Sequence, residues 1–173
     1  MLFTKRTNQS TDWARPYQNT SVLQKSAFDA CTAVIASISH EFGVSYYEIH
    51  PFSVTTVEFS QYLQNLRKTF GTKPLSLFLD NLAVHRNADV KELAAELDIR
   101  LVFNKSNQYD YQPIEETFNL VKQWFRKNKL NRLANGQELD KERMIRESFE
   151  RVSRKHVRIQ IERARERLRN DIE

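Results

Sequence analysis

The stretch from residue 75 to 104 most constrains the fold, because two short apolar runs flank a helical pattern there. The first run is LSLFLD, at residues 75–80, and the second is IRLVFN, at residues 99–104. Between them, residues 86–98 carry apolar side chains at helical spacing, with Asn87 as a candidate N-cap. A helix between two short strands predicts a right-handed crossover and a parallel pair. The first apolar run also predicts a strand covered on both faces.

The flanking segments extend this pattern to an α/β fold. Residues 30–50 place β-branched and aromatic residues on both sides of Gly43, which predicts an antiparallel hairpin. Apolar residues three and four positions apart predict helices over residues 56–70, over residues 112–128 and, after a loop, over residues 139–170. We therefore expect a mixed sheet with flanking helices and a long C-terminal helix. In such sheets ligands bind at the carboxyl ends of the parallel strands.

Composition indicates one globular domain with a basic C-terminal third. Of the 173 residues, 40% are hydrophobic and 28% are charged, and the single cysteine, Cys31, excludes a disulfide within the chain. Residues 120–173 contain 16 Lys and Arg against 9 Asp and Glu, a net charge of +7, which leaves −2 of the total +5 for the first 119 residues. This excess favours a polyanionic partner and a solvated helical surface about equally.

No apolar run is long enough for a signal peptide or a membrane-spanning helix. We therefore expect an intracellular protein that does not bind a membrane. If the source is eukaryotic, the expected compartment is the nucleus, and otherwise it is the cytoplasm.

Asp80 follows the first apolar run directly, at the edge where such a sheet carries its chemistry. Asn81 comes next, and His85 stands five positions after the aspartate. An aspartate at a strand exit can form a turn, cap a helix or bind a metal ion. Taken alone, the pattern favours the turn, because Asp and Asn are common at turns.

A second carboxylate, Glu115, lies in the first turn of the helix predicted for residues 112–128. There are 34 residues between Asp80 and Glu115. Because the strand of residues 99–103 would return beside the strand that ends at Asp80, the helix after it can bring Glu115 to the same edge. Two carboxylates there would form half of a magnesium or manganese site.

These two segments together resemble a known family. LFLDNLAVH, followed at this distance by QPIEE, is similar to the DDE transposases of the Tc/mariner and related bacterial insertion-sequence superfamily. That family has a ribonuclease-H-like catalytic domain, with its second catalytic aspartate in a DNAxxH motif at a strand end and its third acidic residue about 34 residues later in SPDLNPIE. The matching residues here are Asp80, Asn81 and His85 in the first motif, and Asp110, Pro113, Ile114 and Glu115 in the second.

The resemblance implies metal-dependent cleavage and transfer of DNA strands, as in DNA transposition and integration. Two Mg²⁺ or Mn²⁺ ions would be held by carboxylates, with Asp80 and Glu115 as catalytic metal ligands. Asn81 and His85 would support these carboxylates or contact phosphate. The implied partners are DNA at transposon ends and target sites, together with a second copy of the chain or a full-length transposase.

Basic residues near the end of the helix over residues 112–128 are candidate DNA contacts. Arg126, Lys127 and Lys129 follow Trp124 and would suit phosphate groups. A core aromatic residue beside a solvated helix end explains the same pattern.

The chain departs from the family in two places. KSNQYDYQPIE lacks three prolines of the family's PPYSPDLNPIE and has Gln112 in place of the usual Asn. No residue matches the first catalytic aspartate: Asp12 lies in a polar stretch, and MLFTKRTNQSTDWAR resembles the segment that follows this aspartate, with Trp13 in the place of a family tryptophan.

We therefore expect an N-terminally truncated member of the family. Residues 1–130 would form the ribonuclease-H-like catalytic domain without its first acidic strand, and residues 131–173 a basic C-terminal helical extension. Loss of the first aspartate would leave this chain inactive by itself. The alternative function is a non-catalytic transposase remnant that binds nucleic acid or a partner protein.

Overall fold

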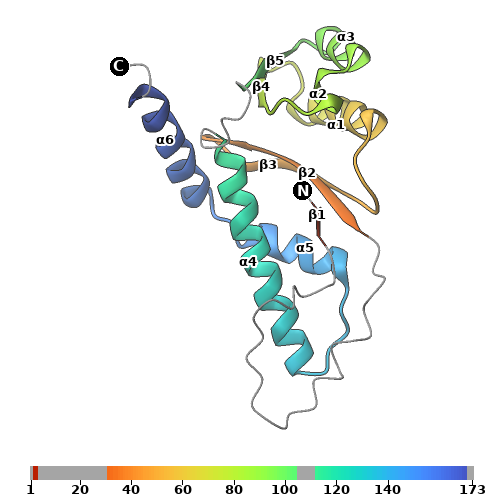
Figure 1. The fold of residues 1–173 in the computed structure, drawn as a ribbon, viewed down its shortest axis with the longest axis vertical. Coiled ribbons are helices and arrows are strands. Elements are labelled where there is room, and N and C mark those ends of the chain that lie inside the picture. Colours follow the sequence, from red (N-terminus) through yellow and green to blue (C-terminus); the bar gives the residue numbers. More distant parts are fainter. Residues whose placement is uncertain (1, 4–30, 105–111, 171–173) are drawn as a thin grey trace.

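The computed structural model describes residues 2–3, 31–104 and 112–170, and its strands and helices form the predicted α/β fold (Figure 1). In chain order the elements are β1 (Leu2–Phe3), β2 (Thr32–Ser39), β3 (Gly43–His50), α1 (Thr56–Phe70), β4 (Leu75–Leu79), α2 (Ala83–Arg86), α3 (Ala88–Glu96), β5 (Ile99–Phe103), α4 (Pro113–Ala134), α5 (Lys141–Glu150) and α6 (Arg154–Asn170).

β2 and β3 form the predicted antiparallel hairpin, and β1 pairs with the other edge of β2. Successive side chains of a strand point to opposite faces, so Val34 faces a core made with α4, α5 and α6, whereas Ile35 faces α1. Gly43 begins β3 with a φ of 76°. A Cβ atom on it would lie 3.0 Å from the Cα of Arg154 at the start of α6, so any larger residue would displace this helix.

β4 and β5 form the predicted parallel pair, in register from Leu75 opposite Ile99. On the outer face of the pair, Phe78 is 48% exposed and Val102 is 38% exposed. The prediction that residues 75–80 are covered on both faces is therefore wrong, because the described helices α1 and α3 pack on one face only.

The described strands lie in two sheets, β1–β2–β3 and β4–β5, where we expected one mixed sheet. β1 is the outer strand of the first sheet, and its described residues, Leu2 and Phe3, pair with β2.

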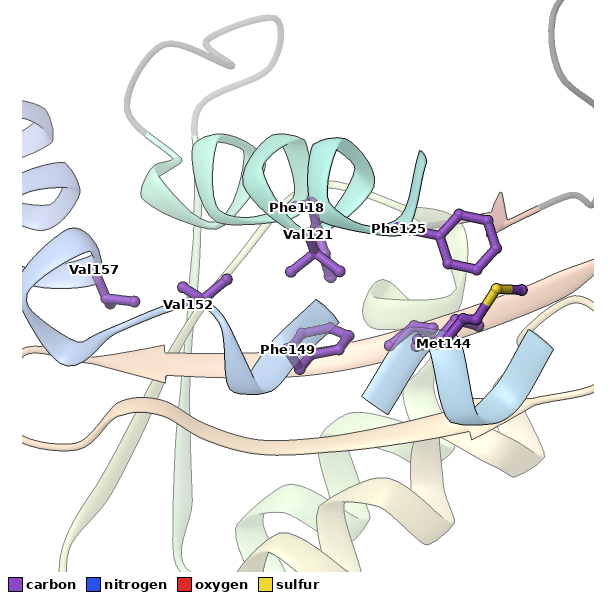
Figure 2. Close-up of a cluster of buried hydrophobic side chains, with 9 residues drawn as sticks. Phe118, Val121, Phe125, Met144, Phe149, Val152 and Val157 are labelled. Atoms are coloured by element: carbon purple, nitrogen blue, oxygen red, sulfur yellow. The ribbon is translucent and has the colours of Figure 1, made fainter. Parts of the chain in front are cut away.

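Two apolar cores hold the layers together. The first lies between α1, α3 and the covered face of β4 and β5, and includes Phe59 and Leu63. The second lies between the hairpin and the C-terminal helices, and Figure 2 shows Phe118 of α4, Phe149 of α5 and Val157 of α6 in this cluster. The segment predicted as a C-terminal extension therefore supplies part of a core.

The predicted starts of three helices are confirmed by their caps. The Thr55 hydroxyl accepts a hydrogen bond from the Val57 amide at the start of α1, within a capping box completed by Glu58. Asn87 caps α3, accepting a hydrogen bond of 2.8 Å from the Asp89 amide. Pro113 begins α4, where a missing N–H group costs nothing.

Two helix boundaries differ from the prediction. α4 ends at Ala134 rather than near residue 128. The single helix predicted over residues 139–170 is wrong, since α5 and α6 are separated by a short turn. Ser153 accepts a hydrogen bond of 3.3 Å from the His156 amide at the start of α6, and the turn lets Val152 reach the second core.

Within the described residues, no helix is both long and apolar enough to span a membrane.

Candidate functional site

Asp80 stands at the carboxyl end of β4 and is held through one carboxylate oxygen. Its Oδ1 lies 2.7 Å from Nδ1 of His85 and accepts a second hydrogen bond, of 3.3 Å, from the Leu82 amide. The described residues make no hydrogen bond to Oδ2. The hydrogen bond from His85 is the main cause of a lowered Asp80 pKa, so the carboxylate is charged at neutral pH.

His85 is held in turn by the first core. The short helix α2 carries it back toward Asp80, and its ring centroid lies 4.4 Å from that of Phe59 in α1, with 44° between the ring planes. Phe59 is 2% exposed, and the His85 side chain is 16% exposed. A buried ring therefore limits the movement of the histidine that orients Asp80.

Asn81 connects the ends of the two parallel strands. Its Nδ2 donates to the carbonyl of Asn104, while the Asn104 amide donates to the Leu79 carbonyl at 2.8 Å. This bond leaves Asn81 Oδ1 buried and without a hydrogen-bond partner. An amide oxygen is a hard ligand of the kind that Mg²⁺ and Ca²⁺ bind, so the edge beside Asp80 carries a second suitable oxygen.

Glu115 occupies the first turn of α4 and is exposed. A negative charge there is favoured by the helix dipole. Figure 1 shows that the N-terminal end of α4 is the end nearer to β4 and β5. No hydrogen bond joins Glu115 to Asp80, Asn81 or His85. The structure therefore groups Asp80, Asn81 and His85 at one strand end, and a site that they share with Glu115 stays a prediction.

Several predicted features lie outside the described residues. They include Asp110 of the second motif, and Asp12 and Trp13 of the N-terminal stretch. In the described part of the chain, no three side chains among His, Cys, Asp and Glu are grouped so that they could hold a metal ion.

The candidate DNA contacts on α4 differ in their exposure. Arg126 and Lys127 are exposed, but Lys129 is only 7% exposed. The Lys127 ammonium lies over the half-buried Trp124 ring, 5.1 Å from its centroid. Lys129 is therefore poorly placed for a phosphate contact, and the charge of the surface depends on the other two.

Sequence reasoning missed two residues that the tertiary structure brings to these sites. Phe59 was visible only as one member of an apolar stripe. Arg151 lies over the Trp124 ring, 5.7 Å from its centroid, although the two are far apart in sequence. Neither residue carries a local sequence signal, because each contact joins two separate elements. Phe59 of α1 meets His85 of α2, and Trp124 of α4 meets Arg151 at the end of α5.

Comparison with known proteins yields one family and one fold. The family described as DDE superfamily endonuclease matches residues 1–139. Among solved structures, the Mos1 transposase paired-end complex with the left transposon end is 18% identical, with a TM-score of 0.65 over 96% of this chain and 51% of that chain. The Mos1 catalytic domain with raltegravir and Mn is 17% identical, with a TM-score of 0.59 over 81% of this chain and 73% of that chain.

A further Mos1 catalytic-domain structure, with raltegravir and Mg, is 16% identical, with a TM-score of 0.57 over 79% of this chain and 71% of that chain. No curated protein sequence matches. The chain spans about half the length of the transposase chain in the paired-end complex. These likenesses confirm the ribonuclease-H-like catalytic-domain fold, and since the family match covers most of the sequence, the chain belongs to the DDE superfamily endonucleases.

Proposed function

We propose that this chain forms the catalytic domain of a divalent-metal-dependent enzyme that cuts and joins DNA strands in transposition. Asp80 and Glu115 would supply two of its metal-binding carboxylates. The observation that carries the proposal is the state of Asp80, which is charged, sits at a parallel strand end and is oriented by hydrogen bonds from His85 and the Leu82 amide to Oδ1. A charged carboxylate held in one orientation is what metal binding needs.

The oxygen donors of this edge fit magnesium or manganese. Mg²⁺ is usually bound by one or two carboxylates together with water and substrate phosphates, so a complete protein cage is not required. The buried Asn81 Oδ1 adds a neutral oxygen without a partner. The Mos1 catalytic domains solved with Mn and with Mg support the same class of ion. Two bound ions would activate the attacking oxygen and stabilise the leaving oxygen of a phosphodiester.

The protein's own part is to position groups. His85 keeps the Asp80 carboxylate from rotating, and Asn81 ties β4 to β5 so that the edge keeps its shape. Arg126 and Lys127 are exposed cations that suit DNA phosphates. The partners would be transposon-end and target DNA, with a second copy or a full-length transposase, and the compartment would be the nucleus or, in a bacterium, the cytoplasm.

A cleavage assay on duplex DNA with Mg²⁺ or Mn²⁺ tests the proposal. Nicking by the wild-type chain would contradict the expectation that loss of the first aspartate leaves it inactive by itself. We expect Asp80→Asn to abolish any such metal-dependent nicking, because the isosteric amide removes the charge that binds the metal. Asp98→Asn is the matched control, since Asp98 has a φ of 51°, a conformation that Asn also adopts, and offers only its backbone carbonyl to Arg67. Nicking that Asp80→Asn leaves unchanged would exclude the catalytic role.

A second candidate is a non-catalytic module that binds DNA or a partner transposase. One observation favours it: the +7 charge of residues 120–173. This function predicts salt-sensitive DNA binding without nicking in any metal. The binding module would be selected over the enzyme if the wild-type and Asp80→Asn proteins both bind DNA in a salt-sensitive way and neither nicks it.

A further inference from the structure

A pocket of about 310 Å³ lies between α4 and α5. Trp124, Lys127 and Asn131 line it from α4, and Glu147 and Arg151 line it from the end of α5. These helices pack on the face of the hairpin opposite to α1, so the pocket and Asp80 belong to different layers. Its volume is at the lower end for ligand sites and suits a single planar ring system.

The pocket combines an aromatic wall with two exposed cations. Lys127 Nζ and Arg151 Cζ lie 5.1 Å and 5.7 Å from the Trp124 ring centroid. The Lys127 and Arg151 side chains are exposed, so either can swing off the ring when a flat ligand stacks on it. Trp124 is half-buried and is not among the side chains that form the second core.

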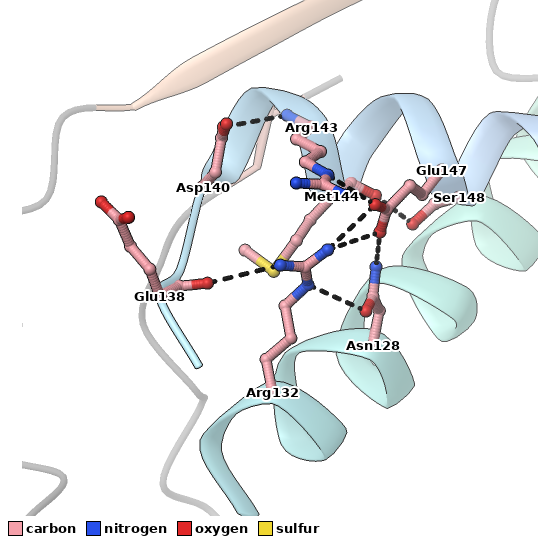
Figure 3. A network of polar contacts seen from close by, with 8 residues as sticks. All are labelled: Asn128, Arg132, Glu138, Asp140, Arg143, Met144, Glu147 and Ser148. Atoms are coloured by element: carbon pink, nitrogen blue, oxygen red, sulfur yellow. Dashed lines mark hydrogen bonds and ion pairs between the residues drawn. The ribbon is translucent and has the colours of Figure 1, made fainter. Parts of the chain in front are cut away.

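Charge around the pocket favours an anion. Figure 3 shows Glu147 bound by Arg132, Arg143 and Asn128, with Arg132 Nη2 at 2.9 Å and Arg143 Nε at 3.0 Å. These two arginines more than offset the charge of Glu147.

The lining itself carries two cations, Lys127 and Arg151, and two carboxylates, Glu147 and Glu150. Because Arg132 and Arg143 already pair with Glu147, the two lining cations are left against the single carboxylate of Glu150. An aromatic anion would therefore gain stacking on Trp124 and ion pairing with Lys127 and Arg151.

We propose that this pocket binds one unstacked nucleotide of a DNA strand, with the base against Trp124 and the flanking phosphates on Lys127 and Arg151. Stacking on an aromatic side chain suits any base, and exposed Lys and Arg suit the backbone. The choice of DNA rather than a free nucleotide rests on the proposed function. Single-stranded DNA fits better than duplex, because a paired base cannot present its face to a protein ring.

Fluorescence of Trp124 tests this directly, because the chain contains only two tryptophans. In a Trp13→Phe background of the full chain, a 12-nucleotide single strand should quench the remaining emission in a saturable way. A blunt duplex of the same sequence should quench it much less. Equal quenching by the duplex, or quenching by polyglutamate instead of DNA, would overturn the proposal.

Binding of a labelled single strand gives a second measurement. Since base stacking contributes about 1–3 kcal/mol per base, Trp124→Leu should weaken binding about five-fold or more, while Trp124→Phe should retain most of the affinity. Gln123→Ala, on the exposed side of the same helix, is the matched control. Unchanged affinity in a folded Trp124→Leu chain would refute the site.

Asp80→Asn separates this proposal from the proposed function. It should leave the quenching of Trp124 unchanged while it abolishes nicking. Nicking that persists in Asp80→Asn would refute the catalytic proposal alone, and unchanged binding by Trp124→Leu would refute the pocket alone.

Discussion

Phe149→Ala tests whether the C-terminal helices belong to the same cooperative unit as the sheet. Phe149 is 3% exposed in α5. Its ring stacks on Tyr47 of β3, with 4.2 Å between centroids and 9° between planes, and meets Phe118 of α4 edge-on at 6.5 Å. One side chain thus joins a strand and two helices from distant parts of the chain.

The expected loss follows from burial and from these two aromatic contacts. Truncation of a buried Phe to Ala costs about 3–5 kcal/mol, and each of the two aromatic pairs adds about 0.5–1.5 kcal/mol beyond burial, so we expect a loss of about 4 kcal/mol or more. A domain of this size is commonly stable by only about 5–15 kcal/mol, so the variant should be marginal. Phe52→Ala is the matched control, because Phe52 is 68% exposed and should change stability by less than about 0.5 kcal/mol.

Urea unfolding followed by far-ultraviolet circular dichroism measures this loss. If the helices and the sheet unfold together, Phe149→Ala lowers the midpoint and leaves one transition with an unchanged slope. A loss under about 1.5 kcal/mol, or a second transition confined to helix signal, would show that α5 and α6 form a separately folding extension.

Three further predictions concern single polar contacts. His85→Ala should raise the Asp80 pKa toward its ordinary value, measured by carboxyl NMR titration; an unchanged pKa would disprove the hydrogen bond. Arg132→Gln, which breaks a bridge between α4 and α5, should cost about 1–2 kcal/mol, whereas Arg146→Gln, in an exposed pair within α5, should cost less than about 0.5 kcal/mol. Hydrogen bonds from Asn128, Arg132 and Arg143 lower the Glu147 pKa. The stability that these bonds give the wild-type protein should therefore be complete above the ordinary carboxyl pKa and fall as pH drops through the lowered pKa. An equally steep loss of stability in Glu147→Gln would argue against this cause.

Much of the fold could be predicted because its signals are local. Gly43 marked the hairpin turn, and the candidate cap Asn87 marked a helix start. The break between α5 and α6 could not be read in this way, because the apolar stripe continues through it. Only the core decides that Val152 turns inward there.

The candidate site was predictable in part for the same reason. Asp80 follows a strand and Glu115 opens a helix, and both positions follow from short-range patterns. The spacing of the two motifs then indicated the family, which the family match confirmed. Whether Glu115 reaches the edge that carries Asp80 depends on the path of the connecting segment, which no local pattern encodes.

The sequence by itself determined the identity of most strands and helices, the parallel pair and the residue that stands at its carboxyl end. Periodicity and capping are properties of a few neighbouring residues, so they survive without any knowledge of packing. Tertiary structure alone decided that Phe59 holds His85 against Asp80, that Phe78 and Val102 of β4 and β5 are exposed, and that Arg151 meets Trp124. These contacts join residues far apart in the chain, and only the packing of one element on another brings such residues together.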